Sequence, residues 1–158
     1  LITEDLETPQ EACGYAADVD GHAQERISEQ LAEKCSGLEY LCSCLRPGSL
    51  RPQVREAFVQ QALARGVVEE AVKLIAQGDA TVAGAATNFL ADLCFNSRVS
   101  TKRVMSRFQG LADRFRYLFA SPAALTENSL LSGATVLCAN LAATSDPGDH
   151  GNIVRLAQ

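Results

Sequence analysis

The chain has 158 residues, of which 47% are hydrophobic, 21% charged and 6% aromatic, with a formal net charge of −5 at neutral pH. This composition excludes disordered and collagen-like proteins, and no run of 18 apolar residues is present to span a bilayer. The length suits one domain or part of a repeated array. We expect no signal peptide in this sequence, because the first residues lack a basic stretch followed by an apolar run.

The N-terminal part is strongly acidic. Residues 1–40 carry ten acidic side chains against two basic ones. The first 21 residues include a proline and two glycines and show little periodicity, so we expect residues 1–21 to form a loosely ordered segment or cap. An inhibitory segment that folds back onto the basic part of the chain is an alternative. The repeat domain is expected over residues 22–158.

Apolar residues recur at helical spacing through the rest of the chain, and no convincing alternating pattern typical of strands occurs. The sequence therefore predicts an all-α protein, with helices over 28–45, 80–96, 98–108 and 127–143 and shorter helices that follow Gly66 and Gly110. Asp79 is expected to cap one helix, and Ser121 with Pro122 to begin another after a turn. A further helix is expected to begin within 151–158.

An internal repeat is the most informative feature. The segments Leu41–Leu45, Phe89–Leu93 and Leu137–Leu141 align at steps of 48 residues. The same step aligns three small residues, which we expect to permit close helix approach: Gly37, Ala85 and Gly133. The repeat units are expected at about 22–45, 52–96 and 98–143, with the start of another at 151–158.

Two segments, Gly66–Cys94 and Gly110–Ala142, resemble armadillo repeats. Each has a glycine before a short helix and a longer helix that ends in a phrase like Leu-Cys-Ala-Asn-Leu, and the resemblance extends over residues 28–143. It implies a right-handed α-solenoid of three-helix repeats, whose third helices line a concave groove for a peptide or helix.

The resemblance also implies an asparagine ladder in the groove, with tryptophan one turn earlier. Only Asn140 keeps the asparagine, Asp92 and Cys44 replace it in the other units, and no tryptophan is present. A groove that reads basic peptides, as in nuclear import, is therefore disfavoured. Groove contacts are expected from Tyr40, Asn88, Asp92, Val136 and Asn140, with hydrogen bonding inside the fold as the alternative for the polar members.

The stretch 98–116 is basic and has two interpretations. It could be an ordinary solvated helix, with Val104, Met105 and Phe108 facing inward. Alternatively it forms a surface for an acidic peptide or an anionic membrane, whereas the low overall pI disfavours nucleic acid. The basic patch comprises Arg98, Lys102, Arg103, Arg107, Arg114 and Arg116.

No catalytic or metal-binding motif is visible, so we expect neither an enzyme nor a metal or cofactor site. His22 and His150 lie far apart, and the six cysteines form no Cys-x-x-Cys pair. Buried, reduced cysteines are expected, which favours a cytoplasmic or nuclear protein. A redox or catalytic site at Cys42 and Cys44 is the least favoured hypothesis.

Together these features predict a non-catalytic interaction or adaptor module that binds another protein in the groove of a helical array. The alternative is a scaffold held at an anionic membrane or phosphoinositide surface by the basic patch. Unfinished array ends would expose apolar edges, so homodimerisation through these ends is a further expectation.

Overall fold

The computed structural model describes residues 12–122, 126, 128–146, 148 and 154. The regular elements of this part are α1 (Ala12–Leu45), α2 (Pro52–Ala64), α3 (Val67–Gln77), α4 (Ala80–Cys94), α5 (Arg98–Met105), α6 (Phe108–Phe119) and α8 (Asn128–Thr144). No strand occurs among the described residues, and the all-α prediction is confirmed. The helix expected within 151–158 and most of the loop expected near residues 123–126 lie outside them.

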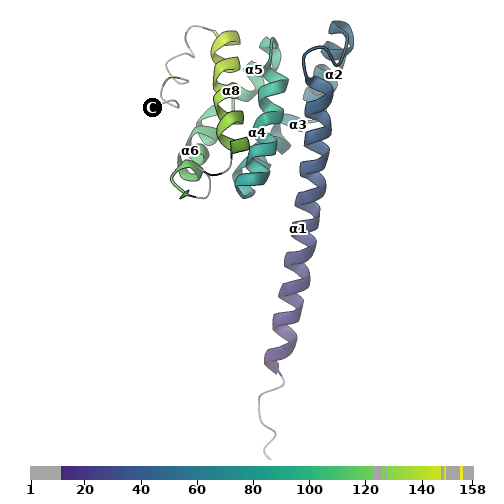
Figure 1. Cartoon of the computed structure of the whole chain (residues 1–158), viewed down its shortest axis with the longest axis vertical. Coiled ribbons are helices and arrows are strands. Elements are labelled where there is room, and N and C mark those ends of the chain that lie inside the picture. Colours follow the sequence, from purple (N-terminus) through teal and green to yellow (C-terminus); the bar gives the residue numbers. More distant parts are fainter. Residues whose placement is uncertain (1–11, 123–125, 127, 147, 149–153, 155–158) are drawn as a thin grey trace, which may run out of the picture.

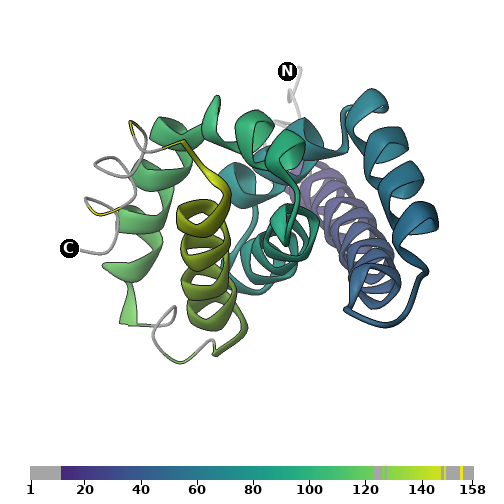
Figure 2. The ribbon, with the colours of Figure 1, turned by 90° about the horizontal axis from the view of Figure 1, so that it is seen from above.

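Helix α4 lies at the centre of the fold, between α1 and α8 (Figure 1). Helix α3 packs against α4 and also contacts α2 and α6, while α5 contacts both α4 and α8. Seen from above, α1, α4 and α8 form one row, and α2, α5 and α6 are arranged around it (Figure 2). The N-terminal half of α1 extends well beyond the other helices.

The central position of α4 is encoded in its composition. Eleven of its fifteen residues are buried, and among its small residues are Gly84, Ala85 and Ala86. The buried Thr87 hydroxyl donates to the Ala83 carbonyl one turn earlier, at 2.6 Å, so this polar group needs no outside partner. A helix of small and apolar residues can be covered on several sides at once.

Two helix ends predicted from the sequence are confirmed. In each case the predicted residue itself supplies the capping hydrogen bond or the required backbone angle. The Asp79 side chain accepts a hydrogen bond from the Val82 amide at 3.0 Å, so it caps α4 as predicted. Gly66 has a φ of 71° and separates α2 from α3. This left-handed conformation is strained for residues with a Cβ atom, which explains the glycine.

The short helix predicted to follow Gly110, in contrast, begins before it, so Gly110 does not separate two helices and this prediction is wrong. Helix α5 ends at Met105 and α6 begins at Phe108, so Gly110 lies inside the first turn of α6. The backbone of Ser106 stays near helical angles, and the chain turns without a left-handed residue. The helix predicted over 98–108 is therefore shorter than expected. Val104 is buried and Met105 is partly buried, as predicted, while the Phe108 side chain lies outside the described ones.

Two further expectations differ from the structure. Helix α1 begins at Ala12, so it includes part of the segment 1–21, which was expected to be a loosely ordered segment or cap. An added Cβ on Gly37 would meet nothing within 4 Å, whereas one on Gly133 would lie 2.6 Å from the Asn88 side chain. Close helix approach therefore requires a small residue at position 133 but not at position 37.

Two arginines join neighbouring helices by binding helix C-terminal carbonyls, which lack donors within their own helix. Arg55 of α2 donates to the Asp92 carbonyl at 2.8 Å, near the end of α4. Arg114 of α6 donates to the carbonyls of Ile75 and Gly78, both at 2.9 Å, where α3 ends. A cation at a helix C-terminus also interacts favourably with the helix dipole.

The Arg114 contacts lead to a stability prediction. Arg114→Met should lower the free energy of unfolding by about 2 kcal/mol, because two part-buried carbonyls lose a charged donor. The matched control Arg116→Met removes an exposed arginine that pairs with Asp113, and should change stability by less than about 0.5 kcal/mol. Urea denaturation followed by circular dichroism measures both values, and similar effects of the two variants would contradict the assignment.

Candidate functional site

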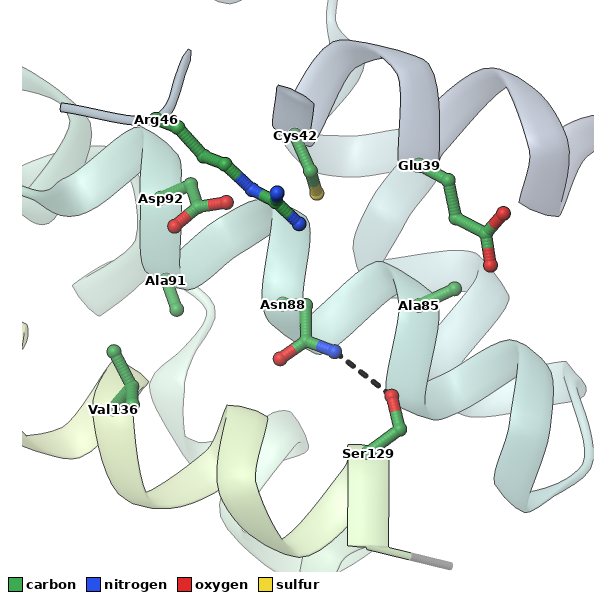
Figure 3. Close-up of a pocket in the computed structure, with 9 residues that line it drawn as sticks. All are labelled: Glu39, Cys42, Arg46, Ala85, Asn88, Ala91, Asp92, Ser129 and Val136. Carbon is green, nitrogen blue, oxygen red and sulfur yellow. Dashed lines mark hydrogen bonds between the residues drawn. The ribbon is translucent and has the colours of Figure 1, made fainter. Parts of the chain in front are cut away.

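A polar cavity of about 530 Å³ opens where α1, α4 and α8 meet. Figure 3 shows side chains from all three helices around it, together with Arg46, which follows the end of α1. The cavity is lined by Glu39, Cys42, Arg46, Ala85, Asn88, Ala91, Asp92, Ser129 and Val136. Three of these residues carry formal charge, two negative and one positive, so the cavity suits a polar occupant.

Asp92 is the half-buried charge of this cavity. Burial raises the pKa of its carboxyl group above the usual value, and a hydrogen bond from the Cys42 thiol and the nearby Arg46 and Arg55 partly oppose this shift. The pKa of the Cys42 thiol is raised to about 12, mainly by burial and secondly by the negative charge of the adjacent Asp92. The carboxylate is thus incompletely compensated by the residues around it, and the thiol stays protonated at neutral pH.

The interface between α1 and α4 beside the cavity lacks a hydrogen bond that joins α4 to α8 at the next interface. Between α4 and α8, the Asn140 amide donates to the Ala91 carbonyl at 2.8 Å. One repeat earlier, the equivalent positions are Asp92 and Ser43. A carboxylate cannot donate to a carbonyl. In addition, Pro47 has no N–H for the Ser43 carbonyl four residues before it.

On the α8 side, the cavity is held by Asn88. Its amide nitrogen donates to the Ser129 hydroxyl at 2.9 Å, which ties α4 to the first turn of α8 (Figure 3). Gly133 leaves room for the Asn88 side chain at this crossing. Asn88 therefore serves as a structural link and also contributes its polar surface to the cavity.

The structure brings three of the five predicted groove residues together in the cavity: Asn88, Asp92 and Val136. Tyr40 lies on α1 outside the cavity lining and is 69% exposed. Asn140 is half-buried and uses its amide to bind the α4 backbone.

Glu39, Arg46 and Ser129 also line the cavity but were not predicted from the sequence, and Cys42, predicted only as the least favoured redox site, lines it as well. Glu39 and Arg46 lie within one turn of the aligned segment Leu41–Leu45, and this position was the signal for them.

The predicted basic patch is divided among several local pairs. Arg98 and Lys102 lie near Asp146 at 3.6 and 3.9 Å, Arg103 pairs with Glu69 at 2.6 Å, and Arg114 binds carbonyls of the α3 end and the loop after it. These contacts reduce the charge available to a partner. No helix of the described residues is long and apolar enough to cross a bilayer.

The described residues hold no group of three or more His, Cys, Asp or Glu side chains suited to a metal ion. His150 and the side chain of His22 lie outside this description. Burial raises the pKa of Cys94 to about 12, as it does that of Cys42, and a thiol of this kind is a poor nucleophile.

Comparisons of this chain with protein-family models, curated proteins and solved structures found no significant match.

The missing donor at Asp92 predicts that Asp92→Asn stabilises the fold. The new amide should reach the Ser43 carbonyl, as Asn140 reaches Ala91, and should raise the free energy of unfolding at pH 7 by about 1 kcal/mol. Urea denaturation measures this gain, and an unchanged or lower stability would contradict it.

The pH dependence provides a control for this variant. Because the pKa of Asp92 is raised, the folded state holds this proton more tightly than the unfolded chain. The resulting stabilisation is present below the pKa of the unfolded chain and is lost as pH rises through the folded pKa. Only the wild type regains this stabilisation on acidification, so the advantage of Asp92→Asn should shrink as pH falls through the folded pKa and be smallest below about pH 4.

The thiol environment predicts slow alkylation of Cys42 and Cys94 in the folded protein. With a pKa of about 12, each thiol should react with iodoacetamide at pH 8 at least about 100-fold more slowly than in urea. Peptide mass spectrometry after timed labelling gives the rate for each cysteine. Fast labelling of native Cys42 would instead favour a reactive cysteine site.

Proposed function

We propose that this chain belongs to a right-handed armadillo-type α-solenoid that acts as a non-catalytic interaction module. Its binding surface is the row of α1, α4 and α8, which holds an extended peptide or a helix of another protein. The proposal is supported by the repeat of 48 residues, which aligns parts of these three helices, and by their arrangement side by side (Figures 1 and 2). Stacked helical repeats commonly present extended binding surfaces of this kind.

The observation that carries the proposal is the polar cavity at Asp92. A half-buried carboxylate with incomplete compensation costs stability, and a fold with a structural role alone has no need of it. The equivalent Asn140 shows that an amide at this position can close the interface with a hydrogen bond. A binding role explains why Asp92 leaves the cavity open.

The charges in the cavity indicate the chemistry of the occupant. The carboxylates of Glu39 and Asp92 provide acceptors, and Arg46 is the one cation among the lining residues. An ammonium or guanidinium group from a single partner side chain supplies the missing donors. For this contact the partner needs only one basic side chain, whereas a full asparagine ladder would bind a long series of basic residues.

Exposed apolar side chains near the cavity can provide the remaining contact area. Val136 lines the cavity and is 45% exposed, and Tyr40, which follows the lining residue Glu39 in α1, is 69% exposed. Tyrosine is enriched among the residues that dominate binding energy at interfaces. The pairing of basic residues within the fold makes the membrane alternative weaker, since a partner must compete with Asp146 and Glu69.

A matched pair of tyrosines tests this surface. Tyr40→Ala should reduce retention of the partner by an immobilised chain at least about tenfold, a loss of about 1.4 kcal/mol. The control variant Tyr117→Ala should still retain the partner. Tyr117 is as exposed as Tyr40, at 68%, but it lies on α6, outside the proposed surface. Quantitative mass spectrometry of proteins retained from a cell extract measures the ratio, and equal losses from both variants would contradict the proposed surface.

Asp92→Asn serves as the second variant in this experiment. It removes the charge but is expected to be at least as stable as the wild type, so loss of the partner cannot reflect unfolding. Undiminished binding by this variant would show that the carboxylate does not anchor the partner.

A further inference from the structure

Three hydroxyl side chains follow an arginine by three positions in the sequence: Ser49 after Arg46, Thr101 after Arg98, and Ser106 after Arg103. Protein kinases select their substrates partly by charge, and acidic groups in a kinase can bind an arginine at a fixed distance from the reacting hydroxyl. Such recognition requires an accessible hydroxyl and an arginine that is free to bind. The structure distinguishes the three candidates on both requirements.

Thr101 and Ser106 do not meet these requirements. Thr101 is fully buried in α5 and is hydrogen-bonded to Thr144 of α8. Ser106 is exposed, but its hydroxyl donates to the Arg103 carbonyl at 2.7 Å. Arg103 pairs with Glu69 at 2.6 Å, so its guanidinium group already has a partner. A kinase would have to break both contacts to use Ser106.

Ser49 meets both requirements. It lies in the exposed turn 46–49 between α1 and α2, and its hydroxyl makes no hydrogen bond with the described residues. The Arg46 side chain is exposed too and makes no ion pair within the described part of the chain. In that part, residues 47–50 make a single backbone hydrogen bond, from the Ser49 amide to the Arg46 carbonyl at 3.0 Å. The turn therefore opens at little cost into the extended form that a kinase binds.

We propose that Ser49 is a phosphorylation site for an arginine-directed protein kinase that uses ATP. The Ser49 Oγ atom forms a bond to the γ-phosphorus of ATP, the bond from this phosphorus to the β–γ bridging oxygen breaks, and ADP leaves. The hydroxyl proton passes to the catalytic carboxylate of the kinase. The product carries a phosphate group with a charge of about −1.5 to −2 at neutral pH.

The phosphate group acts on the Asp92 cavity through Arg46. Ser49 and Arg46 share one turn, and the Arg46 side chain extends into the cavity beside Asp92 (Figure 3). Phosphate groups form charge-assisted, bidentate hydrogen bonds with arginine, so phosphorylated Ser49 draws Arg46 away from Asp92. The cavity then loses the one cation among its lining residues and binds a basic anchor more strongly, a consequence that rests on the proposed function.

Phosphorylation of the full chain tests the site. The probe is Mg-ATP with a calmodulin-dependent protein kinase that selects arginine three residues before serine. Timed peptide mass spectrometry should show that Ser49 is modified at least about tenfold faster than Ser106. In synthetic peptides of residues 43–53 and 100–110 the two serines should differ by at most about threefold, because the fold and not the local sequence protects Ser106.

Two arginine variants test the recognition. Arg46→Met should slow the modification of Ser49 at least about tenfold. The matched control Arg65→Met removes an exposed arginine at the other end of α2 and should leave the rate unchanged. Three outcomes would overturn the proposal: no phosphate at Ser49, equal rates at Ser49 and Ser106 in the full chain, or an unchanged rate in Arg46→Met.

Carbon-13 NMR of the Asp92 carboxyl group tests the effect on the cavity without a partner. Arg46 lowers the pKa of this carboxyl, against the larger effect of burial. In the chain phosphorylated at Ser49 the measured pKa should therefore rise, whereas Ser49→Ala treated with the same kinase should keep the wild-type value. An unchanged pKa would overturn the effect on the cavity but not the proposed function, which the Tyr40 and Asp92 variants test separately.

Discussion

The close packing of α4 between α1 and α8 is the constraint on which the other features depend. At Gly84 an added Cβ would lie 3.1 Å from the Leu130 amide nitrogen, and at Gly133 it would lie 2.6 Å from Asn88. Larger residues would push α8 away from α4. That displacement would break the Asn140–Ala91 hydrogen bond and widen the cavity on its α8 side. Small residues thus determine the position of the polar groups as well as the core.

A second regularity is that side chains from neighbouring elements satisfy helix C-terminal carbonyls. Arg55 and Asn140 do so for α4, and Arg114 does so for α3. Each bond joins residues that are 37 to 49 positions apart in the chain. At the end of α1 the corresponding residue is Asp92, which cannot donate. The candidate site therefore departs from the arrangement seen at the ends of α3 and α4, and such departures are expected at functional positions.

Elements and their ends were predictable where the signal is local. Asp79 and Gly66 were identified because a cap or a left-handed turn depends on one side chain and its immediate backbone. The prediction for Gly110 failed because glycine permits a left-handed turn without requiring one, and the turn at Ser106 made it unnecessary. The alignment of Asn88, Asp92 and Val136 by repeat register led to three residues of the cavity, since equivalent positions on stacked helices meet at one surface.

The sequence by itself determined the helical class, the repeat spacing and the helix ends that local hydrogen bonds specify. Only the tertiary structure decided which polar side chains meet. It assigned Asn140 to the Ala91 carbonyl, brought Cys42 to Asp92, and divided the basic stretch between Glu69, Asp146 and the α3 end. The physical reason is range: helix formation depends on residues within one turn, whereas these pairings depend on distances between helices that the packing of small and large side chains sets.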